Sequence, residues 1–92
     1  MSAVNSSAVQ VPRAYCVRVV REILPRHPGV ALREVFSPSL YPPVVAVRYA
    51  AMRLVHQRKP EASIASIGRG FGRHHTSVLY ALGRRGRRGG VA

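Results

Sequence analysis

Four consecutive polar side chains, Arg-His-His-Thr at positions 73–76, carry most of the capacity for chemistry in this sequence. They stand between a glycine-containing stretch, "IGRGFG", and an apolar run, "SVLYAL". Imidazole, guanidinium and hydroxyl groups form hydrogen bonds, and imidazole also binds metals and moves protons. The four residues are therefore candidates for a metal site, for catalysis or for recognition of another molecule. An ordinary solvated surface is the plain alternative.

A metal site is not supported by the spacing of the possible ligands. Structural zinc takes four ligands, usually cysteine and histidine at short, regular spacings. His74 and His75 are adjacent, so on a helix their side chains point about 100° apart. The other candidates form no spacing motif with them: Cys16, His27 and His56. We predict neither a metal nor a cofactor.

Catalysis is also disfavoured. The chain contains no aspartate, and its glutamates stand in separate segments of the sequence, at Glu22, Glu34 and Glu61. Acid–base and nucleophilic catalysis both require such groups within hydrogen-bonding distance of one another. We predict that the protein is not an enzyme and has no small-molecule substrate.

The charge balance indicates a polyanionic partner. Lys and Arg number 15 against 3 Asp and Glu, a net charge of +12, and all but one of the bases are arginine. Such an excess repels itself, whereas phosphates of DNA or RNA match it. An anionic membrane surface is the alternative. However, no apolar run is long enough to span a membrane, and the N-terminus lacks a signal-peptide pattern. We expect DNA as the partner, no membrane, and a cytoplasmic, nucleoid-associated location.

The apolar periodicity predicts an all-α domain at residues 11–83, between a flexible lead at 1–10 and a basic Gly/Arg tail at 84–92. A first helix is expected from about Pro12, at the first helical position, to residue 25 or 26. A short helix is expected within 30–36, and a third from 43 or 44 to just before 60. Arg48 and His56 are expected outside the buried face of this third helix. The inward residues are expected to be Cys16, Val19, Val20, Ile23 and Leu24 on the first helix and Val47, Ala51, Leu54 and Val55 on the third.

Two short helices follow. Ser63 is expected to cap a helix over Ile64–Phe71, and a last helix begins at residue 75 or 76 and ends before a left-handed Gly83. The inward residues are expected to be Ile64, Ile67, Phe71, Val78, Leu79 and Leu82. Two helices joined by a tight glycine-containing turn are typical of a helix-turn-helix. In that motif the start of the second helix meets base edges in the major groove.

The segment "SIASIGRGFGRHHTSVLYAL" resembles the C-terminal DNA-binding domain of the bacterial replication initiator DnaA, whose signature is similar to "LPEIGRAFGGRDHTTVLHA". The upstream "VVAVRYAAMRLV" is similar to the family's "PIVEARQIAMYL". The shared residues are Arg48, Ala51, Met52, Leu54, Ile67, Gly68, Phe71, Gly72, Arg73, His75, Thr76, Val78, Leu79 and Ala81.

The resemblance implies a small helical bundle with a helix-turn-helix, Trp-repressor-like or DnaA C-terminal-domain-like, that binds duplex DNA at specific sequences. Its base-reading residues would be Arg73, His74, His75 and Thr76. It further implies phosphate contacts by Arg48 and by the backbone N–H groups of Ser63 and Ile64. The other phosphate contacts that we predict are Arg69, Ser77, Arg84 and Arg85.

The sequence departs from the family at three places. His74 stands where the family has aspartate; a carboxylate accepts from cytosine N4, whereas a histidine can donate or accept, so the preferred base is open. Residues 37–43, "SPSLYPP", lack the family's basic segment, so the minor-groove contact is expected to be lost. No phosphate-binding loop of the G-x-x-x-x-G-K-[ST] type occurs, so this chain is not expected to unwind an origin alone.

The sequence thus predicts a free-standing regulator of replication or transcription that binds DnaA-box-like sites as a monomer or weak homodimer. Two alternatives remain open. One is a basic protein that binds DNA or RNA without sequence preference. The other is a protein-interaction module that docks on the replication or transcription machinery.

Overall fold

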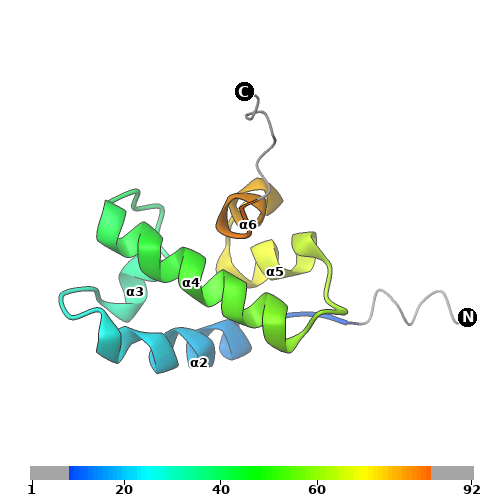
Figure 1. Ribbon diagram of the computed structural model, residues 1–92, viewed down its shortest axis with the longest axis horizontal. Coiled ribbons are helices and arrows are strands. Elements are labelled where there is room, and N and C mark those ends of the chain that lie inside the picture. The colour runs from blue at the N-terminus through cyan, green and yellow to red at the C-terminus, as the bar shows by residue number, and fades with distance from the viewer. Residues whose placement is uncertain (1–8, 84–92) are drawn as a thin grey trace, which may run out of the picture.

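In the computed structural model, which describes residues 9–83, the chain forms α-helices and one 3₁₀ turn and, within that range, no strand (Figure 1). The elements are α2 (Arg13–Ile23), η1 (Leu24–Arg26), α3 (Leu32–Val35), α4 (Pro42–Arg58), α5 (Ile64–Phe71) and α6 (His75–Ala81). The expectation of an all-α helical bundle is confirmed.

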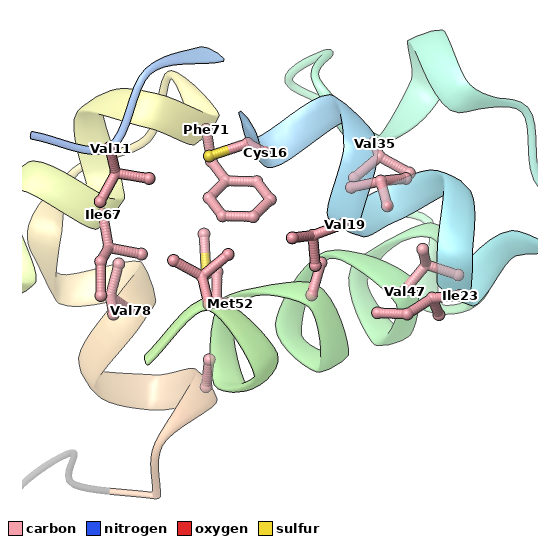
Figure 2. Close-up of a cluster of buried hydrophobic side chains, with 14 of the residues drawn as sticks. Val11, Cys16, Val19, Ile23, Val35, Val47, Met52, Ile67, Phe71 and Val78 are labelled. Atoms are coloured by element: carbon pink, nitrogen blue, oxygen red, sulfur yellow. The ribbon is translucent and has the colours of Figure 1, made fainter. Parts of the chain in front are cut away.

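Helices α2 and α4 pack against each other and line much of the core. The apolar stripe of α2 is buried as expected except for Leu24, which lies in η1 and is half-buried. Figure 2 shows Phe71 of α5 pointing into the same cluster, near Met52 and Cys16. The buried members of this cluster on α2 and α4 are Cys16, Val19, Val20, Ile23, Val47, Ala51, Met52 and Val55.

Prolines set the helix boundaries, and some differ from the prediction. Pro12 has an extended backbone, with ψ 155°, and is the N-cap, so α2 begins one residue later than expected. The helix gives way to η1 because Pro25 has no N–H to continue the α-helical ladder. The second helix is only Leu32–Val35 because Ala31 is still extended, with ψ 147°. Helix α4 begins at Pro42 and so takes both prolines into its first turn, where their missing N–H groups cost nothing.

The segment before α2 belongs to the domain. Val9 is half-buried against the core, and the backbone N–H of Val11 donates to Ser66 Oγ of α5 at 3.1 Å. Val9 therefore packs on the domain, whereas the sequence predicted a flexible lead over residues 1–10. The rest of that prediction, residues 1–8, lies outside the described residues, as does the predicted tail at 84–92.

Gly70 allows this segment and α2 to approach α5. A Cβ at Gly70 would lie 2.5 Å from the Val11 carbonyl oxygen and 2.7 Å from Cys16 Sγ, both closer than side chains tolerate. Because one of these atoms is backbone, the clash cannot be relieved by a rotamer change alone.

We predict that Gly70→Ala lowers the free energy of unfolding by about 1–3 kcal/mol through overpacking, although alanine favours helix. The measurement is denaturant unfolding followed by far-UV circular dichroism. The control is Ala65→Gly at an exposed position of the same helix, which tests propensity alone and should cost about 1 kcal/mol. A more stable Gly70→Ala protein would contradict the close contact.

Candidate nucleic-acid interface

Helix α5 begins at the predicted cap and ends in a backbone motif that fixes the following turn. The Ser66 N–H donates to Ser63 Oγ at 3.0 Å, which confirms Ser63 as the N-cap. At the other end, Gly72 is left-handed, with φ 70°. Its N–H donates to the Arg69 carbonyl at 3.0 Å, and the Arg73 N–H donates to the Gly68 carbonyl at 2.8 Å. These two bonds form a Schellman motif, which ends the helix and directs the chain toward α6.

A second glycine of α5 lets the turn fold back closely. A Cβ at Gly68 would lie 2.8 Å from the Arg73 carbonyl oxygen and 3.3 Å from the Cα of His75. Only a residue without a side chain leaves room for the start of α6 to lie against α5 in this way. The backbone of residues 73–75 therefore lies directly against Gly68.

Helix α6 begins with His74 as its N-cap. The Thr76 N–H donates to His74 Nδ1 at 3.3 Å, and Thr76 Oγ1 lies 2.9 Å from the same nitrogen. The rings of His74 and His75 are in contact, with centroids 4.3 Å apart. A histidine thus occupies the N-cap position of α6, where aspartate, asparagine and serine are the most common residues.

One side of α6 is buried and the other is exposed. The helix packs on α4 and α5, and in Figure 1 it lies on the far side of them from α2. Val78 and Ala81 are buried, while Leu79 and Leu82, which were expected inward, are half-buried. Arg53 of α4 donates to the Ala81 carbonyl at 3.1 Å and so supports the last turn. Gly83, at φ 76°, has the left-handed conformation expected of it.

The exposed side carries the base-reading candidates. His74, His75 and Thr76 are exposed, and Arg73 is half-buried. The structure therefore brings all four together at one end of α6, around a turn of fixed shape. Among the phosphate-binding candidates, Ser63 and Arg69 are exposed and Ile64 and Ser77 half-buried, whereas Arg84 and Arg85 lie outside the described residues.

The expectation that Arg48 lies outside the buried face is wrong. Its side chain is only 1% exposed, and it has four backbone carbonyls as acceptors. Nε donates to Val35 at 2.8 Å, Nη1 to Ser39 at 3.0 Å, and Nη2 to Ser37 at 2.9 Å and Glu34 at 3.3 Å. A guanidinium that is buried and has four of its five N–H groups bonded inside the domain is not accessible to a phosphate.

Arg48 is nevertheless affected electrostatically by the candidate interface. Burial lowers the pKa of its guanidinium, and the positive charge of Arg73 lowers it further. The loop that Arg48 holds, between α3 and α4, presents Leu40 and Tyr41, which are 72% and 63% exposed. No basic residue occurs in this loop.

We predict that Arg48→Lys lowers the free energy of unfolding by at least about 2 kcal/mol, because one ammonium group cannot reach four carbonyls. Denaturant unfolding measures this. The control is Arg53→Lys, an exposed arginine with one carbonyl partner, which should change stability by less than about 1 kcal/mol. Unchanged stability with a loss of DNA affinity would restore a phosphate-binding role to Arg48.

Arg13 is a candidate that the sequence did not reveal. Its guanidinium lies over the Phe36 ring, 5.1 Å from the centroid, and Phe36 stacks on Phe71 at 5.7 Å. Arg13 Nη2 would lie 3.0 Å from a Cβ at Gly72, so this exposed arginine reaches the α5–α6 turn. No local pattern links positions so far apart in the sequence.

A metal site and a reactive cysteine find no support in the part of the chain that the structure describes. No three or more His, Cys, Asp and Glu side chains gather there in a way that could hold a metal ion. Burial raises the pKa of the Cys16 thiol to about 12, which keeps it protonated. None of the helices within residues 9–83 combines the length and the apolar character needed to cross a membrane.

Comparisons of this chain with protein-family models, with curated proteins and with solved structures find no match. The likeness to DnaA therefore rests on the sequence motif.

We predict that His74→Ala lowers the free energy of unfolding by about 0.5–2 kcal/mol, whereas His74→Asp, which is also a good N-cap, leaves it nearly unchanged. Thermal unfolding followed by circular dichroism measures both. An equal loss in the two variants would mean that the His74 imidazole does not act as the cap.

Proposed function

We propose that this chain binds duplex DNA, reads its sequence with the start of α6, and regulates replication or transcription at sites similar to those of DnaA. In this proposal α5, the turn and α6 act as a helix-turn-helix, with α5 across the DNA backbone and α6 in the major groove. The protein would act at the nucleoid, as a monomer or weak homodimer.

The observation that carries the proposal is the row of polar side chains at the start of a helix whose other side is buried. His74, His75 and Thr76 are exposed there, and Val78 and Ala81 anchor the same helix in the core. Base edges are read by donors and acceptors on a convex element that fits the major groove. The contacts at Gly68 and Gly72 fix the backbone from which these side chains project, and a fixed backbone favours specific recognition.

Cations near this row could position the duplex through its phosphates. Arg69 on α5 is exposed, and Arg13 lies beside the turn. Glu61, exposed just before Ser63, would oppose a phosphate at the start of α5. Arg13 and Arg69 are therefore stronger phosphate contacts in this proposal than the backbone of Ser63 and Ile64.

Selection of bound sequences from a random duplex pool tests the proposal. We expect one short motif to be enriched. Binding to that motif should weaken with salt, with a slope of log K against log salt of about −5 if about six phosphates are neutralised. A pool without an enriched motif would refute sequence reading.

We predict that His75→Ala weakens binding to the selected site by about 1–3 kcal/mol and changes binding to random duplexes little. Fluorescence anisotropy with both duplexes measures this. The matched control is Arg33→Ala on α3, an exposed residue whose loss should weaken both complexes slightly and equally. If His75→Ala weakens both complexes equally, His75 contacts the DNA backbone only.

A second candidate function is nucleic-acid binding without sequence preference, and one observation favours it. The outer side of α2 carries a shallow hollow lined in part by Arg18, Arg21 and Lys59 around Tyr15. Lys59 Nζ lies 4.8 Å from the Tyr15 ring centroid. Cations thus occur far from α6 as well, and equal affinity for selected and random duplexes would support this function instead.

A further inference from the structure

The capping hydrogen bond of His74 favours one of the two neutral tautomers of its ring. The Thr76 N–H points at His74 Nδ1 from 3.3 Å, and an N–H can only donate. Nδ1 must therefore offer a lone pair, and in a neutral imidazole the proton then resides on Nε2. The Thr76 hydroxyl, 2.9 Å from Nδ1, can donate to Nδ1 in this tautomer or accept from an Nδ1–H in the other, so the backbone N–H is the group that favours the first.

The outward-facing group of His74 follows from this tautomer. Nδ1 is directed toward Thr76, and Nε2 lies across the ring from it, on a side chain that is exposed. In the capping form, Nε2–H is a donor. In the doubly protonated form, Nε2–H is also a donor. The remaining neutral form would accept at Nε2. Its Nδ1–H could donate to the Thr76 hydroxyl, but it would oppose the Thr76 N–H and so lose the backbone cap.

We infer that His74 is a specificity-determining residue that selects a base with a major-groove acceptor, guanine above all, and rejects cytosine. The inference rests on the proposed function, because it assumes that the start of α6 meets base edges. Guanine offers two acceptors, N7 and O6, whereas cytosine offers only its N4 amino donor. A carboxylate at this position would have the opposite preference. Histidine in place of the aspartate of the DnaA signature would thus change the preferred base from cytosine to guanine, and the helix cap would be kept.

The first test requires no DNA. Nitrogen-15 NMR of the His74 imidazole in the full chain, near neutral pH, distinguishes the two neutral tautomers. We expect Nε2 protonated and Nδ1 unprotonated. Thr76→Ala serves as a comparison, because it removes the hydroxyl but leaves the backbone N–H, so the same tautomer should persist. A ring with its proton on Nδ1 overturns the inference whatever the DNA results.

The second test uses two variants of the same shape. His74→Asp and His74→Asn both cap helices well. When the side-chain oxygen of each serves as the cap, asparagine still presents an amide donor, whereas aspartate presents only acceptors. Random duplex pools are selected with the wild type and with each variant. At one position we expect guanine for the wild type, an acceptor base for His74→Asn and cytosine for His74→Asp, with a preference of roughly fivefold, as one hydrogen bond provides.

The outcomes separate the inference from the proposed function. If the wild type enriches no motif, the proposed function fails, and the base preference fails with it. If the wild type enriches a motif but His74→Asp and His74→Asn leave every position of it unchanged, only the inference is overturned. Circular dichroism of both variants confirms that a changed motif reflects base reading and not unfolding.

Discussion

The buried guanidinium of Arg48 holds one end of this small domain together. A guanidinium removed from water is tolerated only when its donors are matched, and Arg48 meets this requirement with carbonyls of α3 and the loop that follows it. Helix α3 is a single turn, too short to be stable alone. Arg48 therefore connects α3 and the loop to α4, and the positive charge of Arg73 at the candidate interface lowers the pKa of its guanidinium.

The candidate interface is directly connected to the hydrophobic core. Phe71, the last residue of α5, is fully buried, and the next residue is the left-handed Gly72 that directs the chain into the turn. Phe36 stacks on Phe71, and Arg13 lies over Phe36. The residue that packs in the core, Phe71, is thus followed directly by the turn that places the exposed polar groups. Such support holds the backbone that carries the exposed polar groups in one position.

Most features that depend on neighbouring residues were predictable to within a residue or two at the helix ends, and those that depend on distant residues were not. The Ser63 cap, the ends of α5 and the left-handed Gly83 follow from short-range rules and agree with the structure. Arg48 was misplaced because helical periodicity classes arginine as polar, and its carbonyl partners come from another segment. The position of Arg13 beside Gly72 depends on how α2 packs on α5, which no local pattern encodes. The grouping of residues 73–76 was predictable, but the capping role of the His74 ring required the positions of its atoms.

The two glycines within α5 have a consequence for the independence of this region. A helix of eight residues is marginal in water, and Gly68 and Gly70 each weaken it by about 1 kcal/mol relative to alanine. A peptide spanning α5 and α6 would therefore remain largely unstructured outside the domain. The two helices adopt this arrangement only within the folded domain. The same glycines that weaken the isolated helix α5 permit its contacts with Val11, Cys16 and the start of α6. The proposed DNA recognition would therefore require the whole folded domain.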